Sequence, residues 1–419
     1  MSAIASASWD EWVAKSAALL RGNRIEVDGW RYTAPATSPT AHAAYVHQFL
    51  WDSCFHALTW RWFDPAMARD ELRALVAAQV QDGPDTGMIP HMTSRRGGSE
   101  QLWGCPDHSL ITQPPLIAVT AMLLHADVPD VPLLAELYPA LCAFHAWFER
   151  RRDPDGDRLV CLIHPWESGW DASPRWDRAM GLPGDMTYEQ GRLARVALAA
   201  HVVESGCDAG ALLRAGSYCV ESVDYNAIRA ADLEALGEMA AALDRPQEAT
   251  AWAGRAAQVR EMFQRKMVRD GAPYDLDGVD EQPVVQESAA QAVALFGGCL
   301  TEAQAAHLVA QLRQPRHWPR FPVPTSPTDS PAFVPDRYWR GNVWLSVNWL
   351  IYMGLRRYGY AALASELAER SLALVAQGGF WEYYHPLTGQ GLGSPSYSWS
   401  AIVLDMLGRE RGLVPPRQA

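Results

Sequence analysis

Two carboxylic acids in this 419-residue sequence lie in surroundings that would suit an acid and a base in catalysis. Asp171 lies in the segment 164–177, which holds three carboxylates and three tryptophans, with Gly, Ser and Pro residues that resist a regular helix. Glu382 is the one carboxylate among four aromatic residues in the segment 378–389. An apolar wall raises the pKa of a neighbouring carboxyl group by desolvation, as a general acid near neutral pH requires. Two such groups on opposite sides of a cavity could hydrolyse a glycosidic bond.

The segment that holds Asp171 also has a purely structural interpretation. The acids of the segment 164–177 could instead pair with Arg175 and Arg178. Asp171 and Glu382 are 382 − 171 = 211 residues apart, so they can meet only if the fold brings distant loops together.

The aromatic composition is unusual, because 18 Trp exceed 14 Tyr and 10 Phe. Trp51 and Asp52 stand side by side near the start of a predicted helix. There the carboxylate could accept hydrogen bonds from sugar hydroxyls while the indole covers an apolar face of the ring. Asp52 could equally be a buried acid that backbone donors satisfy. The tryptophans in or beside the polar, aromatic-rich segments are Trp51, Trp166, Trp170, Trp176, Trp339, Trp344, Trp381 and Trp399.

The elements that must position these residues are helices. Apolar residues recur at helical spacing along most of the chain, and strand patterns are weak apart from 158–163. Asp64-Pro65, Asp224 and Thr301 are typical of helix starts. The predicted helices cover about 7–22, 45–62, 65–81, 113–126, 131–151, 187–205, 208–222, 224–243, 246–268, 284–299, 301–313, 341–358, 360–376 and 396–411.

No Pro-, Gly- or Ser-rich linker divides the chain, so we expect a single domain over residues 1–419. Roughly six helical hairpins fit an all-α (α/α)6 barrel, in which an inner ring of helices lies inside an outer ring. Long catalytic loops would gather at one end of this barrel and carry the functional residues. The segment 78–112, with its glycines at 97 and 98, is a candidate lid.

Charge and cysteine usage exclude several classes of protein. The formal charge of 36 − 48 = −12 argues against nucleic-acid and anionic-membrane partners. The seven cysteines are scattered and form no C-x-x-C pair, which predicts reduced thiols in a cytoplasmic protein. The N-terminus lacks the pattern of a signal peptide, and no uninterrupted apolar run approaches the roughly 18 residues of a membrane span.

Neither a cofactor nor a metal site is expected. Asp153, Asp155 and Asp157 alternate as the acids of calcium loops do. His164 stands where an EF-hand has its twelfth-position Glu, so an ordinary turn is the favoured interpretation.

Several motifs resemble glycoside hydrolase family 63, and they occur in the order seen in that family. The likeness is greatest to its small bacterial members, the mannosylglycerate and glucosylglycerate hydrolases, and it spans about residues 45–404. The motifs are Trp51-Asp52-Ser53-Cys54-Phe55-His56, Glu167-Ser168-Gly169-Trp170-Asp171-Ala172-Ser173-Pro174-Arg175-Trp176-Asp177, Tyr338-Trp339-Arg340-Gly341, Phe380-Trp381-Glu382-Tyr383-Tyr384 and Ser396-Tyr397-Ser398-Trp399-Ser400-Ala401.

The resemblance implies an (α/α)6 barrel and an inverting mechanism on α-glycosides. It assigns the general acid to Asp171 and the general base to Glu382, whose carboxyls should then lie about 6.5–9.5 Å apart. Ala172 departs from the family, which usually has Asn there, and this puts rate or specificity in doubt more than reaction type. The sugar pocket that the resemblance implies consists of Trp51, Asp52, Gln113, Tyr338, Trp339, Arg340, Trp344 and, in the Glu382 motif, Trp381.

The substrate is expected to be a small α-glucoside or α-mannoside, and glucosylglycerate or mannosylglycerate fits best. Arg95 and Arg96 are candidates to bind the glycerate carboxylate, although they could be solvated loop residues. A trehalase-like or oligosaccharide α-glucosidase activity is the main alternative. A sugar epimerase, which would use paired histidines, and a non-catalytic sugar-binding protein are the others. The oligomeric state is left open.

Overall fold

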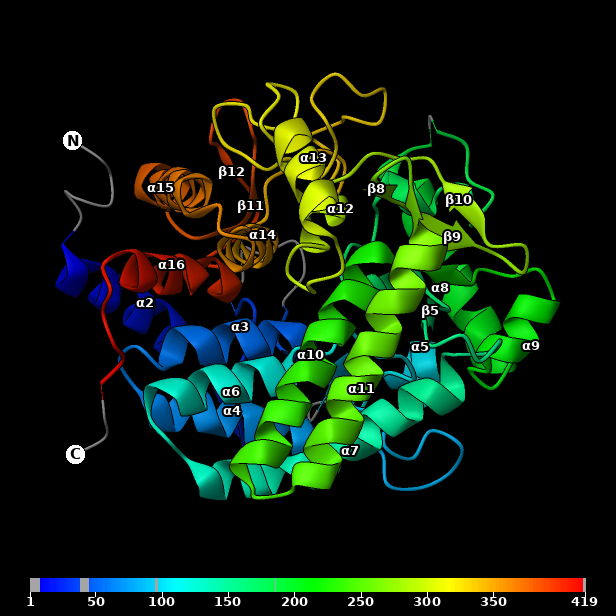
Figure 1. Ribbon diagram of the computed structural model, residues 1–419, viewed down its shortest axis with the longest axis horizontal. Coiled ribbons are helices and arrows are strands. Elements are labelled where there is room, and N and C mark those ends of the chain that lie inside the picture. Colours follow the sequence, from blue (N-terminus) through cyan, green and yellow to red (C-terminus); the bar gives the residue numbers. More distant parts are fainter. Residues whose placement is uncertain (1–7, 38–44, 95–96, 185, 417–419) are drawn as a thin grey trace.

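The computed structural model describes residues 8–37, 45–94, 97–184 and 186–416, and helices make up 51% of the structure. Among the described helices, five pairs of helices that follow one another in the chain pack together, and a sixth pair joins the two terminal helices (Figure 1). The pairs are α3 (Leu50–Trp60) with α4 (Pro65–Ala77), α6 (Ile117–Asp127) with α7 (Val131–Arg151), α10 (Val223–Ala242) with α11 (Pro246–Met262), α12 (Ala290–Val293) with α13 (Glu302–Leu312), α14 (Leu345–Arg357) with α15 (Ala361–Gly378), and α16 (Val403–Glu410) with α2 (Trp9–Gly22).

The first helix of each pair also contacts the first helices of the neighbouring pairs. In turn, α3 contacts α6, α6 contacts α10, α10 contacts α12, α12 contacts α14, α14 contacts α16, and α16 contacts α3. The six helices thus form a closed ring of contacts. Except in the pair of α6 and α7, these helices are the more deeply buried members: every residue of α3 is buried, whereas α11 buries only Trp252, Ala256 and Val259. A helix buried on all sides lies in the interior of a fold, and a helix with one buried stripe lies outside it.

Side-chain caps begin several of the predicted helices where the sequence indicates. Asp64 accepts a hydrogen bond from the backbone of Met67, and Thr301 forms a reciprocal capping box with Gln304. The expectation for Asp224 is wrong, because Ser222 is the N-cap of α10 and Asp224 lies inside its first turn. Asp224 binds a buried arginine instead, as described below.

Short strands replace parts of several predicted helices. The segment 208–222 forms only α9 (Ala209–Arg214) before its end becomes strand β6 (Val220–Glu221), which pairs with β5 and β9. The segment 284–299 keeps only the short α12 as regular α-helix, and the segment 45–62 begins with strand β3 before α3 starts at Leu50. Helical periodicity does not reveal a two-residue strand, because its pairing partners are distant in sequence.

The strands form small antiparallel sheets beside the helices. The largest has the order β10-β9-β6-β5 and lies with α8 (Tyr188–Glu204) and α9 on the side of the molecule away from both termini (Figure 1). The strands are β1 (Arg24–Val27), β2 (Trp30–Thr33), β3 (Gln48–Phe49), β4 (Met92–Thr93), β5 (Cys161–Leu162), β6 (Val220–Glu221), β7 (Val268–Arg269), β8 (Ala272–Pro273), β9 (Asp275–Asp277), β10 (Gln282–Val284), β11 (Trp381–Tyr384) and β12 (Gly391–Pro395). The structure is therefore helix-rich with local hairpins rather than purely helical.

Among the described residues, one helix has the length and apolar composition that could cross a membrane. It is α7, and half of its most apolar window is buried inside the fold. It packs against α4, α6 and α10, and its residues Leu137, Leu141 and Phe144 are fully buried. The apolar character of α7 is therefore accounted for by core packing.

Candidate active site

Glu382 is held in the β11–β12 hairpin by donors from three different segments. Along β11 the side chains alternate, so Glu382 and Tyr384 are buried while their neighbours are partly exposed. The hydroxyls of Tyr338 and Tyr45 donate to its Oε1 at 3.1 and 3.3 Å, and the backbone N–H of Ser394 donates to Oε2 at 3.0 Å. All three donors favour the ionised carboxylate and fix its direction.

Burial of the Glu382 carboxyl works against these donors. Desolvation raises the pKa of Glu382 to about 7, while the hydrogen bonds from Ser394, Tyr338 and Tyr45 lower it. The strand opposite comes very close: a Cβ on Gly393 would lie 2.5 Å from Oε2, and the φ of Gly393 is +75°. A carboxylate with a pKa near 7 is a stronger base than an ordinary glutamate and is still about half ionised at neutral pH.

Asp171 lies in the turn that follows the 3₁₀ helix η1 (Pro165–Ser168). Gly169 makes this turn possible, because its φ is +75° and a Cβ there would lie 2.4 Å from Cζ2 of Trp51. Asp171 is partly exposed, although Trp170 and Ala172 beside it are buried. Desolvation raises the pKa of Asp171 to about 7; the charge of Arg195 lowers it and the charge of Glu382 raises it further.

The other acids of this loop have arginine partners, and Asp171 does not. In the described part of the chain, Glu167 pairs with Arg152 at 2.9 Å and Asp177 pairs with Arg340 at 2.5 Å, whereas no ion pair involves Asp171. The structural alternative of pairing with Arg175 and Arg178 is therefore wrong for Asp171. Its carboxyl is left for another role.

Arg175 anchors the loop from within. Its guanidinium binds Asp275 of β9 and Asp224 of α10 at 2.6 Å each, and all three side chains are buried. The same guanidinium lies over the rings of Trp170 and Trp176, at 5.4 and 4.4 Å from their centroids. Asp171 is thus attached to the sheet and to α10 through its immediate neighbours.

A stack of four aromatic rings joins the loop of Asp171 to the hairpin of Glu382. The ring centroids of Trp170 and Trp339 are 5.0 Å apart, those of Trp339 and Trp344 are 3.6 Å apart and nearly parallel, and those of Trp344 and Tyr383 are 4.7 Å apart. At one end of the stack, Trp170 directly precedes Asp171 in the chain. At the other end, Tyr383 directly follows Glu382. The stack therefore positions the two acids relative to each other.

Asp52 is a third carboxyl of the candidate site. It lies at the start of α3 and is 3% exposed, and its Oδ1 has no hydrogen-bond partner among the described residues. Burial raises its pKa well above the usual range, and the charges of Glu382 and Asp171 raise it further. The structural alternative for Asp52 was a carboxylate that backbone donors satisfy completely. The structure does not match it, because Oδ1 has no partner among the described residues.

Trp51 and Gln113 are held against each other beside Asp52. The Gln113 side-chain oxygen accepts from the backbone N–H of Trp51 at 3.3 Å, and the Gln113 backbone carbonyl accepts from the Tyr225 hydroxyl at 2.9 Å. The Trp51 ring meets the edge of the Trp399 ring, at a centroid distance of 5.9 Å. These two predicted pocket residues therefore lie in the same aromatic region as Glu382, whose backbone carbonyl accepts from the Trp399 indole.

Two of the predicted pocket residues have other partners. Arg340 is occupied by its ion pair with Asp177. The indole of Trp381 donates to the carbonyl of Gly378 at 2.8 Å, and its ring packs over Gly391, outside the aromatic stack. Arg95 and Arg96 lie outside the described residues.

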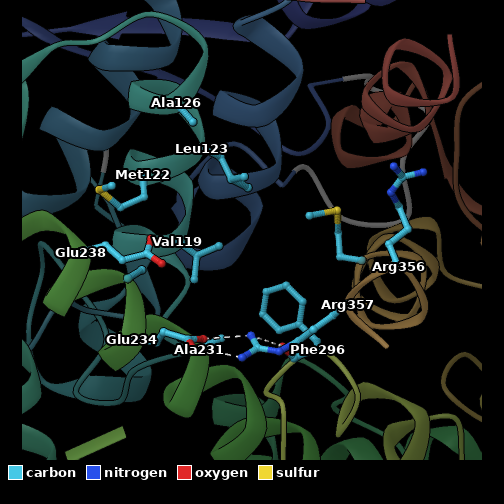
Figure 2. A pocket seen from close by; sticks show the side chains of 12 residues that line it. Val119, Met122, Leu123, Ala126, Ala231, Glu234, Glu238, Phe296, Arg356 and Arg357 are labelled. Carbon is cyan, nitrogen blue, oxygen red and sulfur yellow. Dashed lines mark hydrogen bonds and ion pairs between the residues drawn. The ribbon is translucent and has the colours of Figure 1, made fainter. Parts of the chain in front are cut away.

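A separate cavity of about 380 Å³ lies between α6, α10 and α14 (Figure 2). Its walls are largely apolar, with Glu234 bound to Arg357 at 2.9 Å. None of the candidate site residues lines this cavity. This cavity is therefore separate from the candidate active site.

A family model described as "Mannosylglycerate hydrolase MGH1-like glycoside hydrolase domain" matches residues 45–400. The chain belongs to this family. This MGH1-like chain is a glycoside hydrolase, and the resemblance to glycoside hydrolase family 63 is confirmed.

Named relatives of this MGH1-like hydrolase cover nearly its whole length. It is 33% identical over 407 residues to a mannosylglycerate hydrolase of Thermus thermophilus, covering 89% of this chain and 97% of that protein. It is 32% identical over 449 residues to a glucosylglycerate hydrolase of Mycolicibacterium hassiacum, covering 94% and 97% of the two proteins. A crystal structure of a family 63 mannosylglycerate hydrolase from Thermus thermophilus, in complex with Tris and D-glycerate, superposes with a TM-score of 0.83 at 32% identity, covering 94% of this chain and 99% of that one.

Sequence reasoning missed several residues around the site of the MGH1-like chain. Tyr45 and Ser394 hold Glu382, yet neither has a local pattern that indicates this role. Arg195 resembles any polar residue of the predicted helix 187–205, but its side chain is 5% exposed and close enough to Asp171 to lower its pKa. Gly393, which follows the aromatic-rich segment 378–389, is a sequence signal for a close backbone approach.

Proposed function

We propose that this glycoside hydrolase cleaves a small α-glycoside of glycerate with inversion, using Asp171 as general acid and Glu382 as general base. The observation that carries the proposal is that two electrostatically coupled carboxyls, each with a pKa raised to about 7, face different hydrogen-bond environments. Three donors hold Glu382 and stabilise its ionised form. The proton that the pair retains at neutral pH therefore belongs on Asp171.

In this mechanism, protonated Asp171 donates to the glycosidic oxygen as its bond to the anomeric carbon breaks. Glu382 takes a proton from a water molecule that attacks this carbon from the opposite face. Inversion requires room for that water, so we expect the carboxyls about 6.5–9.5 Å apart in the substrate complex. Ala172, where an Asn is usual in family 63, leaves this chemistry in place and bears on rate or specificity.

The sugar would bind among the residues that the sequence predicts for the pocket. Asp52 would accept hydrogen bonds from hydroxyls through its unpartnered oxygen. Aromatic faces would pack against the apolar side of the ring. The proposed binding set is Trp51, Asp52, Gln113, Tyr338, Trp339, Arg340, Trp344 and Trp381. Within it, Trp339 and Trp344 shape the pocket as members of the stack, and Arg340 and Trp381 keep the protein partners described above.

The position of Arg195 favours a substrate that carries a negatively charged group on the part that is not the sugar. Its guanidinium forms no ion pair with a described carboxylate, lies near the ring of Tyr188 and acts on the charge of Asp171. A guanidinium can bind a carboxylate by two parallel hydrogen bonds. The names of the relatives, which are mannosylglycerate and glucosylglycerate hydrolases, support glycerate as that group. Arg95 and Arg96 remain further candidates.

The helix contacts support a barrel as the scaffold for this chemistry. Among the described residues, six helix pairs have their first members in a closed ring of contacts, and on this basis we propose an (α/α)6 barrel and a single domain over residues 1–419. We further propose that the enzyme acts in the cytoplasm, which suits its seven free cysteines.

The decisive experiment is to hydrolyse glucosylglycerate, mannosylglycerate and trehalose in parallel and to follow the released anomer by proton NMR. The proposal expects a glycerate glycoside as the preferred substrate and the β-anomer as the first product. Release of the α-anomer would contradict inversion, and a clear preference for trehalose would contradict the substrate.

A further inference from the structure

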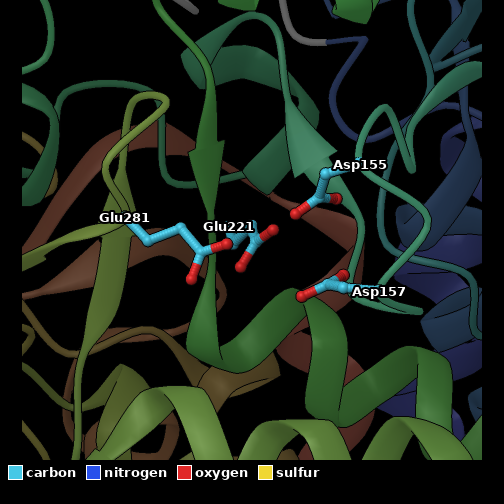
Figure 3. A group of neighbouring side chains, drawn as sticks. All are labelled: Asp155, Asp157, Glu221 and Glu281. Atoms are coloured by element: carbon cyan, nitrogen blue, oxygen red, sulfur yellow. The ribbon is translucent and has the colours of Figure 1, made fainter.

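Four carboxylates converge on one point away from the active site (Figure 3). Asp155 and Asp157 come from the turn that follows α7, Glu221 comes from β6, and Glu281 comes from the turn between β9 and β10. One oxygen of each carboxylate lies within 4.8 Å of the corresponding oxygens of the other three. Like charges this close destabilise one another unless a cation lies among them.

Lys266 supplies part of that positive charge. Its Nζ donates to Asp157 and Glu281 and lies 3.5 Å from Asp155. An ammonium group has three N–H donors, and these three carboxylates use them all. Counting only the three carboxylates that Lys266 contacts and its one ammonium, the cluster keeps a formal charge of −3 + 1 = −2.

Glu221 is the member that the lysine leaves unsatisfied. Its side chain is 7% exposed, and its Oε2 has no hydrogen-bond partner among the described residues. A buried carboxylate oxygen without a partner is costly, so natural sites supply a hydrogen bond or a cation. The Glu221 carboxyl group, which carries this oxygen, points toward the other three carboxylates (Figure 3).

The dimensions of the cluster suit a calcium ion. Ca²⁺ binds carboxylate oxygens at about 2.3–2.6 Å, so ligands on opposite sides of the ion are about 4.6–5.2 Å apart, whereas Mg²⁺ requires about 4.1 Å. The four oxygens lie within 4.8 Å of one another, which is close enough for them to surround a calcium ion. A cavity of about 70 Å³, lined by Asp155, Glu221 and Glu281 among others, leaves space for water molecules to complete the coordination.

We propose that Asp155, Asp157, Glu221 and Glu281 form a binding site for one calcium ion. Lys266 is 22% exposed on a flexible stem, so its ammonium can withdraw to solvent when the ion binds. The ion would link the turn after α7 to β6 and to the β9–β10 turn. Two of these elements adjoin the anchor of the Asp171 loop, since Asp275 lies on β9 and Ser222 follows β6. The site therefore serves stability, and the catalytic carboxyls are not its ligands.

The test is a calcium titration of the full chain after dialysis against EGTA. At a calcium concentration of about 100 times Kd, the expected rise in Tm is about 3 °C for a chain of this length, and calorimetry should count one site. Glu221→Gln should abolish the rise, and Lys266→Met should tighten binding by removing the competing ammonium. Asp329→Asn, an exposed acid paired with Arg316, should keep the wild-type response.

Three outcomes would overturn the proposal. They are no calcium-dependent change in Tm in the wild-type chain, a rise that Glu221→Gln retains in full, and a rise that appears only in Lys266→Met. The last result would mean that the ammonium is the permanent cation of the native cluster. The wild-type titration does not depend on whether any variant folds.

Discussion

The hydroxyl of Tyr338 lies 3.1 Å from Oε1 of Glu382, although the two residues are 44 positions apart in the chain. Tyr338 has a φ of +57°, an uncommon conformation for a large side chain. Its ring is packed edge-on against Trp344 and Tyr383. The tyrosine is therefore held in one place by its neighbours, and it transmits that position to the carboxylate.

Replacing Tyr338 with Phe removes a donor that lowers the pKa of Glu382. The pKa of the base should then rise, and the acidic limb of the pH profile of kcat/KM should move upward by about one pH unit. The sign follows because the base acts in its ionised form, which a higher pKa restricts to higher pH. A profile that keeps its acidic limb while only KM changes would contradict this role for Tyr338.

Asp171→Asn should lower kcat on a glycerate glycoside by roughly 10²–10⁴-fold, because the leaving glycerate needs a proton. An aryl α-glycoside with a nitrophenol leaving group needs little protonation and should lose far less activity. Glu382→Gln is the matched control, since loss of the base should slow both substrates equally. Equal losses on both substrates in Asp171→Asn would contradict its assignment as the acid.

Arg195→Gln should raise KM for the glycerate glycoside by about tenfold or more, because a charge-assisted hydrogen bond to the aglycone is lost. The methyl glycoside of the same sugar, which carries no carboxylate, should keep its KM. The exposed Arg192, on the same helix and paired with Glu189, offers the control Arg192→Gln. An equal change on both glycosides would exclude a role in carboxylate recognition.

Arg175→Met should destabilise the chain by about 3–5 kcal/mol, because Asp224 and Asp275 would be left as uncompensated buried charges. Urea denaturation measures the loss. Arg178→Met removes a mostly exposed arginine whose nearest acid is 3.6 Å away, and should change stability by no more than about 1 kcal/mol. Similar midpoints for the two variants would show that Arg175 is not the anchor of the loop.

The sequence allows a prediction of the helices and of which segments are chemically unusual. Long helices such as 131–151 and 224–243 are predicted closely, since their periodicity and caps are local properties. The strand that carries Glu382 is not, because β11 depends on pairing with β12 and on the close approach of Gly393. Local patterns carry no information about such pairings.

The residues of the candidate site also divide into those that local sequence identifies and those whose roles depend on the fold. Motif residues such as Asp171 and Trp344 can be identified from their own segments. The roles of Tyr45, Arg195 and Arg175 depend on partners outside their own segments, and local sequence offers for Arg175 only the alternative of a partner within its own loop. Whether a charged residue is a ligand, an anchor or a surface group is decided by the fold rather than by its neighbours in sequence.

The nearly parallel rings of Trp339 and Trp344, with centroids 3.6 Å apart, make the molecule its own optical reporter. Two indoles this close couple their strongest electronic transitions, and such coupling produces a pair of signals of opposite sign in far-ultraviolet circular dichroism. The same stack continues to Trp170 and Tyr383, the immediate neighbours of the two candidate catalytic carboxyls. Any event that separates the acid loop from the base hairpin would change this spectrum, without a label and without turnover.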